Sequence, residues 1–178
     1  MEREFRICSG HGIIKLGSYH HGLIEEQSED RAMNKPHNPE TVAPPFSTYS
    51  HAIESTQNCH VLFISGQVGV KPDGSLAEGI EAQTEAALNN IGELPRSASM
   101  DFEDITRLNT YLVNREDITK VRSVREGILG GAEPASTLVL VAGLASEDWL
   151  IEIEAIAAKP WHFYGDGTVF ETRGWPGI

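Results

Sequence analysis

Apolar residues between about residues 46 and 159 recur with two spacings, one typical of strands and the other typical of helices. Clusters at helical spacing predict two helices, one that runs from Ile80 until Pro95 ends it and one from a cap at Asn114 to Gly130-Gly131. Apolar, β-branched runs predict five strands, at residues 46–53, 61–70, 105–113, 136–144 and 149–158.

The predicted order of these elements is β-β-α-β-α-β-β. The first two strands are expected to form a hairpin, and the turn signal at residues 71–74 ends the second of them. Helices that interleave with strands in this way cover one face of a mixed sheet, which predicts an α+β fold. The opposite face is then left uncovered although it is rich in Val, Leu and Ile. We therefore expect copies of the chain to associate through it.

Composition narrows the class of protein. The chain has 178 residues and a formal net charge of -12 at pH 7, which predicts one acidic domain that repels nucleic acid and anionic membranes. No apolar run is long enough to predict a membrane span, and the acidic N-terminal residues do not resemble a secretory signal. Only Cys8 and Cys59 are present, so we expect a reduced, cytoplasmic protein.

Both ends of the chain differ from its middle. Residues 1–33 mix short apolar clusters with paired histidines and an acidic run, and we interpret them as an N-terminal extension. A core domain is expected at residues 34–159. Residues 160–178 are rich in aromatics, which favours packing on the core or on a neighbouring subunit. The aromatics of this C-terminal extension are Trp161, Phe163, Tyr164, Phe170 and Trp175.

The remaining candidate chemistry is weak. His11, His20, His21 and His37 do not have the spacing of a tetrahedral metal site, so no metal is expected. Cys59 has only His60 as a basic neighbour, which does not favour a catalytic thiol. No phosphate-binding glycine loop and no nucleophile elbow occurs, so no cofactor is expected either.

Several segments of the core together resemble the RidA family, also called YjgF or UK114. Their order and spacing are nearly those of the family, so the likeness does not depend on any single motif. The main segments are NPETVAPP (38–45), YSHA (49–52), FISGQVG (63–69), QTEAALNNI (83–91), PAST (134–137) and IEIEAIA (151–157).

This resemblance implies a chorismate-mutase-like fold assembled as a homotrimer, with a cleft between each pair of neighbouring subunits. It also implies hydrolysis of reactive enamines and imines to ketoacids and ammonia. In that reaction an arginine binds the substrate carboxylate, while backbone groups and a water held by a glutamate complete the hydrolysis. Tyr49 and Glu152 match the catalytic positions of the family, and Ser65 and Gly66 match the place where backbone approaches the substrate.

The sequence departs from the family at the position of the arginine, which is Ser136 here. A hydroxyl lacks the charged, bidentate fork with which a guanidinium holds a carboxylate, so the ordinary deamination of amino-acid-derived imines is not expected. Arg122 stands where active members have an asparagine that lines the cleft. It is either a relocated substrate-binding cation or a surface arginine paired with Glu126. A further departure is Ser47-Thr48, where the family usually has Gly-Pro.

These residues indicate an enzyme whose inter-subunit cleft is altered. Its expected substrate is a small carbonyl, enol or imine compound of specialised metabolism, with Tyr49 and Glu152 catalytic and Ser136 a polar contact. Two alternatives stay open: a weak imine deaminase that uses Arg122, and a non-catalytic trimer that binds a ligand or a protein. Ribonuclease activity is also associated with the family, and the acidic charge disfavours it.

Overall fold

The computed structural model describes residues 34–56 and 58–160. Most of the extension predicted at 160–178 and all of that predicted at 1–33 lie outside these residues. Two short 3-10 turns, Phe102–Asp104 and Arg115–Asp117, precede β4 and α2. The strands and helices are β1 (Lys35–His37), β2 (Ala52–Glu54), β3 (Cys59–Val68), α1 (Gly79–Ser97), β4 (Ile105–Leu112), α2 (Ile118–Leu129), β5 (Ala135–Leu140) and β6 (Ile151–Pro160).

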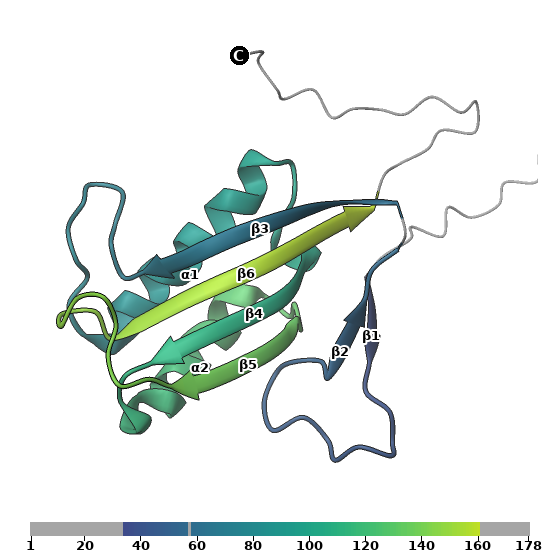
Figure 1. The fold of residues 1–178 in the computed structure, drawn as a ribbon, viewed down its shortest axis with the longest axis horizontal. Helices are drawn as coiled ribbons and strands as arrows, with labels where there is room; N and C mark the ends of the chain where they lie inside the picture. The colour runs from purple at the N-terminus through teal and green to yellow at the C-terminus, as the bar shows by residue number, and fades with distance from the viewer. Residues whose placement is uncertain (1–33, 57, 161–178) are drawn as a thin grey trace, which may run out of the picture. The chain divides into compact units, whose positions relative to one another are not determined.

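Four strands form the main sheet in the order β3-β6-β4-β5. The strand β6 pairs antiparallel with both β3 and β4, whereas β4 and β5 are parallel. Figure 1 shows α1 and α2 on the same face of this sheet. The predicted α+β class, with a mixed sheet and both helices on one face, is confirmed.

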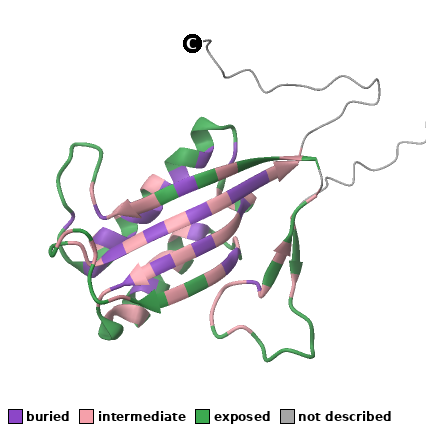
Figure 2. Ribbon diagram, in the orientation of Figure 1, coloured by how far each residue is buried: buried purple, intermediate pink, exposed green. Residues whose placement is uncertain are grey.

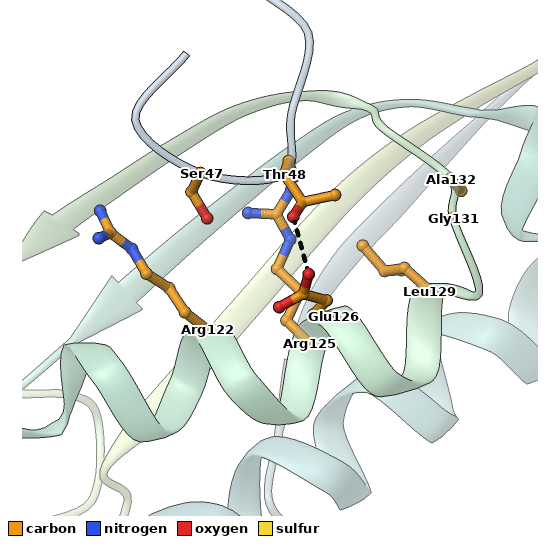
Figure 3. Close-up of a pocket in the computed structure, with 8 residues that line it drawn as sticks. All are labelled: Ser47, Thr48, Arg122, Arg125, Glu126, Leu129, Gly131 and Ala132. Atoms are coloured by element: carbon orange, nitrogen blue, oxygen red, sulfur yellow. Dashed lines mark hydrogen bonds between the residues drawn. The ribbon is translucent and has the colours of Figure 1, made fainter.

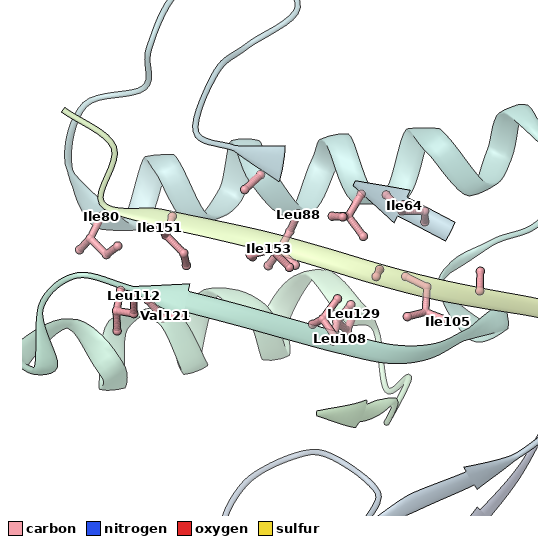
Figure 4. Packing of buried hydrophobic residues seen from close by; sticks show 14 of the residues in the cluster. Ile64, Ile80, Leu88, Ile105, Leu108, Leu112, Val121, Leu129, Ile151 and Ile153 are labelled. Carbon is pink, nitrogen blue, oxygen red and sulfur yellow. The ribbon is translucent and has the colours of Figure 1, made fainter. Parts of the chain in front are cut away.

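The hydrophobic core lies between the helices and the sheet (Figure 4). Along β6 every second residue from Ile151 to Ala157 is buried, and the residues between them are half-buried. The buried residues of α1 recur at the helical spacing that the sequence predicts. The largest fully buried apolar side chains are Leu88, Ile91, Leu108, Leu112, Ile151 and Ile153.

No described helix covers the other face of the sheet. Figure 2 shows this face with alternating exposed residues along β3. Leu62 and Ile64 pack on the core, so Phe63 points the opposite way and is 76% exposed. Val139 on β5 is 41% exposed. The uncovered face agrees with the sequence analysis, and association of copies through it stays a prediction.

The predicted hairpin of residues 46–53 with 61–70 is wrong. Residues 52–54 form β2, which pairs with β1, while β3 pairs with β6. In the segment before β2, the backbone N–H of His51 donates to Asn38 Oδ1 at 2.7 Å instead of to a strand. At Ser50 the segment forms a parallel bridge with Ala135, at the β5 edge of the sheet. Local side-chain bonds of this kind compete with strand pairing.

The helix boundaries differ slightly from the prediction. Pro95 lies inside α1, which continues for two more residues to Ser97 although the Pro95 nitrogen has no hydrogen to donate to the preceding turn. Asn114 precedes the 3-10 turn rather than α2, and its side chain makes no capping bond. Gly130 ends α2 with a left-handed φ of 59°, as its sequence position indicates.

Two properties of the described residues have a bearing on function. None of their helices has both the length and the apolar character needed to cross a membrane. Within residues 34–56 and 58–160, no three or more His, Cys, Asp and Glu side chains cluster in a way that would hold a metal ion. Of the histidines considered above as metal ligands, only His37 is described, and its Nε2 bonds Glu54 at 2.8 Å.

Replacing Leu88 by alanine tests the packing of α1 on the sheet. Because this side chain is fully buried, we expect the free energy of unfolding to fall by about 3 kcal/mol, measured in denaturant. The matched control is Leu94→Ala on the same helix, where the side chain is 38% exposed and the loss should stay below about 1 kcal/mol. Equal losses in the two variants would contradict the described core.

Candidate functional site

An irregularity in the pairing of β3 with β6 brings Gly66 close to Glu152. The register is regular up to Ile64 and resumes at Gln67, so Ser65 and Gly66 occupy the irregular step. A Cβ atom added at Gly66 would lie 2.7 Å from Glu152 Cδ and would overlap the carboxylate oxygen. Only glycine permits this approach of the strand to the Glu152 side chain. The structure thus brings together Ser65, Gly66 and Glu152, three of the residues that the sequence selects.

The Glu152 carboxylate is available for chemistry. Its side chain is half-buried, and among residues 34–56 and 58–160 none donates a hydrogen bond to it. Glu152 and Glu154 share one face of β6, the face that no described helix covers. A half-buried carboxylate without an internal donor can accept a hydrogen bond from a water and remove its proton, which is the role of a general base.

The start of β6 is held in place by Gln83 of α1. This side chain is 2% exposed, and its Nε2 donates to the backbone oxygen of Asp148 at 3.0 Å. Its Oε1 accepts the backbone N–H of Leu150 at 2.9 Å. Two bonds from one buried amide thus fix the loop that leads into Glu152, so the carboxylate is carried on rigid backbone.

Glu154 belongs to a hydrogen-bonded network on the same face of the sheet. Its carboxylate accepts bonds from Asn109 Nδ2 and from the Tyr111 hydroxyl, both at 2.9 Å. The Arg107 guanidinium links Asn109 to Thr137. The Glu154 carboxylate is thus bonded to two side chains of β4. These bonds, the one from Asn109 first, lower the pKa of Glu154, and the bond to Glu154 raises the pKa of Tyr111.

The other candidate residues lie at the β5 edge, with α2. The Ser50–Ala135 bridge places Tyr49 near the start of β5, which contains Ser136. The Tyr49 hydroxyl accepts the backbone N–H of Phe46 at 3.4 Å, and this bond closes the turn of residues 46–49. Ser136 is half-buried and faces the same side of the sheet as its register partner Leu108, which is fully buried against the helices.

Arg122 lines a cavity of about 270 Å³ beneath this turn (Figure 3). One face of α2 supplies the floor, because Arg122, Arg125, Glu126 and Leu129 follow the i, i+3, i+4, i+7 spacing. The remaining lining residues are Ser47, Thr48, Gly131 and Ala132.

Arg125 is a cavity residue that the sequence analysis missed as a binding residue. Its position in the sequence is on the same helical face as Ile118, Val121 and Ile128, which are apolar. A charged residue on an apolar face was the signal available. Its Nη2 donates to the backbone oxygen of Thr48 at 3.0 Å. Burial, followed by the positive charge of Arg122, lowers the pKa of Arg125.

The alternative pairing of Arg122 with Glu126 is not present: among the described residues, no ion pair joins them. The Glu126 carboxylate is instead 3.5 Å from the Thr48 hydroxyl. Arg122 is exposed at the mouth of the cavity, and its guanidinium is oriented toward the same space as Ser47 (Figure 3).

The candidate residues therefore form two groups that are separate within one copy of the chain. Gly66 lies on β3 and Ser136 on β5, and both β6 and β4 run between those strands. Glu152 lies on the uncovered face, whereas Arg122 belongs to a helix that covers the opposite face. A single subunit does not bring the two groups into one site.

Substituting Gly66 by alanine tests the close approach. The new methyl group would displace the Glu152 side chain, so we expect a loss of about 1 kcal/mol in stability that disappears in a Glu152→Ala background. The control is Gly127→Ala in α2, where no atom lies within 4 Å of the added carbon and a gain of up to about 1 kcal/mol is expected. The same loss with and without Glu152 would contradict the described contact.

Titrating the carboxyl groups by NMR tests the network around Glu154. Because the pKa of Glu154 is lowered, its ionised form stabilises the fold at pH values above the ordinary pKa of a glutamate. This stabilisation is lost as the pH falls through the folded-state pKa. Tyr111→Phe removes one donor, so the pKa of Glu154 should rise. The Tyr49 hydroxyl bonds Phe46 and not Glu154, so Tyr49→Phe should leave the pKa of Glu154 unchanged. An unchanged pKa of Glu154 in Tyr111→Phe would contradict the hydrogen bond from Tyr111 to Glu154.

Comparison with known proteins agrees with this architecture. A protein of the Rid family from Yersinia pestis, whose function is described as unknown, superposes with a TM-score of 0.64 at 36% identity, over 70% of this chain and 97% of its own. A RutC family protein of Pyrococcus horikoshii is 35% identical over 67% of this chain and 94% of its own length. The mouse 2-iminobutanoate/2-iminopropanoate deaminase is 32% identical over 62% of this chain and 81% of its own length.

A family model matches residues 40–159, nearly all of the described core. Its description is "Endoribonuclease L-PSP". The matched segment contains β2 to β6, the Gly66–Glu152 approach and the arginine cavity of α2. The chain therefore belongs to the Ribonuc_L-PSP family, which is the family also called RidA, YjgF and UK114.

Proposed function

We propose that this protein is an enzyme that acts on a small carbonyl, enol or imine compound, and that hydrolysis of an imine is its reaction. The observation that carries the proposal is the Glu152 carboxylate, which lies against Gly66 without an internal hydrogen-bond donor among the described residues. The mouse relative named as an imine deaminase supports the same reaction class. The charge of -12 favours a small-molecule substrate over RNA.

The reaction requires one water and no cofactor. Glu152 takes a proton from the water as its oxygen bonds to the imine carbon. That proton passes to the substrate nitrogen and gives a carbinolamine. The carbinolamine hydroxyl then loses its proton to the nitrogen by way of Glu152 as the carbon–nitrogen bond breaks, so that a carbonyl compound and ammonia leave. Backbone at Ser65 and Gly66 lies beside the reacting group, because the absence of a side chain on Gly66 lets the Glu152 carboxylate lie against this backbone. Tyr49 contributes its hydroxyl as a hydrogen-bond partner of the substrate.

The site is completed between two copies of the chain, in a homotrimer. Two observations support this arrangement. The Glu152 group and the Tyr49–Arg122–Ser136 group lie apart in one subunit, and the uncovered sheet face carries exposed apolar side chains such as Phe63. Association through that face buries Phe63 and gives each cleft residues from both neighbours.

Ser136 alters how an acidic substrate is held. A buried guanidinium–carboxylate contact contributes roughly 2–5 kcal/mol, and a neutral hydroxyl does not supply it. The substrate is therefore either uncharged at this position or bound by another cation, and the guanidiniums of α2 are available near the same strand.

The test is the release of ketoacids from imines that a dehydratase generates from serine or threonine. We expect the wild-type protein to accelerate release, and Glu152→Gln to slow this acceleration by about 100-fold because the general base is lost. Glu147→Gln, an exposed glutamate on the loop before β6, is the matched control and should retain the full rate.

Circular dichroism establishes that each variant is folded. A wild-type protein that fails to accelerate release from either imine would contradict the hydrolytic proposal and leave the non-catalytic, ligand-binding trimer in its place. Full activity in Glu152→Gln would show that this carboxylate is not the base.

A further inference from the structure

One face of α2 presents two guanidiniums and one carboxylate, that of Glu126, to the same cavity. Arg122 and Arg125 are three residues apart, so they are neighbours on the helix surface (Figure 3). Neither makes an ion pair with any residue in the ranges 34–56 and 58–160. Two adjacent positive charges in a partly buried place repel each other, which raises the free energy of the unoccupied cavity.

Arg125 carries a donor that no described residue satisfies. Its Nη2 bonds Thr48, which orients the guanidinium, but its Nε is buried and has no acceptor. A buried N–H without a partner costs free energy comparable to a lost hydrogen bond. An anion in the cavity reduces the repulsion between the guanidiniums and brings acceptor oxygens to their donors.

The size and charge of the cavity restrict the anion. A volume of about 270 Å³ suits a molecule of a few carbon atoms. Leu129 and Ala132 line it with apolar surface, which fits a short alkyl group. Two arginines and Glu126 give a net charge of about +1, which complements one carboxylate better than a dianion.

We propose that this cavity binds the carboxylate of a small organic acid, with Arg122 and Arg125 in place of the guanidinium that Ser136 lacks. The identification of the acid as the imine substrate or its ketoacid product rests on the proposed function. The binding of a small acid in the cavity rests on the cavity alone. From the sequence, Arg122 alone was a candidate cation. The structure adds Arg125 and the neighbouring Glu126 to the same cavity.

The test is titration calorimetry with pyruvate, a small ketoacid. Arg122→Gln should weaken binding at least about 10-fold, because it removes an exposed charged fork without disturbing the core. Glu126→Gln removes the negative charge at the cavity and should tighten binding about 2- to 5-fold. Arg115→Gln removes an exposed positive charge just before α2 but outside the cavity, and should leave the affinity unchanged.

The opposite signs expected for Arg122→Gln and Glu126→Gln are a result that general destabilisation would not produce. Affinity unchanged by Arg122→Gln, or weakened as much by Arg115→Gln, would overturn the proposal. Inorganic phosphate serves as the second probe, and binding tighter than that of pyruvate would overturn the assignment to a carboxylate.

The outcome separates this inference from the proposed function. Pyruvate binding that depends on Arg122, in a protein that does not hydrolyse imines, would support the cavity and contradict the enzyme. Imine hydrolysis with an unchanged KM in Arg122→Gln would support the enzyme and contradict the cavity as its carboxylate site.

Discussion

The alternation of side chains along β6 is the constraint on which the rest of the structure depends. This strand pairs with both β3 and β4, so it occupies the interior of the sheet. Ile151, Ile153, Ala155 and Ala157 are buried against the helices, and the period of two then places Glu152 and Glu154 on the opposite face. Packing of the core thereby places two carboxylates on the face that the helices leave open.

The two carboxylates differ because their neighbours differ. Glu154 lies opposite Asn109 of β4, which donates to it together with Tyr111. Glu152 lies against Gly66, which contributes no side chain. A satisfied carboxylate stabilises the sheet, whereas one without a donor can bind water. The chemistry of the site follows from which residues β3 and β4 place beside one strand.

Much of this arrangement could be predicted from the sequence, and the reasons for the rest are physical. Periodicity located α1, β4 and β6 because their buried residues recur at regular spacing. It did not exclude a strand at residues 46–53, where local bonds such as that of His51 to Asn38 replace pairing with β3. It also did not identify Arg125 as a cavity residue, since periodicity does not distinguish a buried guanidinium that lines a cavity from one that packs in the core.

Membership of the RidA family is compatible with Ser136 at the position that the resemblance assigns to the family's arginine. The Gly66–Glu152 approach is present, and the guanidiniums that we propose to bind an acid lie on α2 rather than on β5. The two groups of residues lie on different faces and edges of one subunit. The proposed function therefore requires two copies of the chain, each contributing a different part.

Subunit mixing tests this central claim most directly. Glu152→Gln and Arg122→Gln chains are unfolded together, refolded as a mixture, and assayed for imine hydrolysis. If each cleft takes Glu152 from one subunit and Arg122 from its neighbour, random mixing restores about a quarter of the clefts and about that fraction of wild-type activity. Activity no greater than the average of the two variants refolded separately would contradict a site shared between subunits.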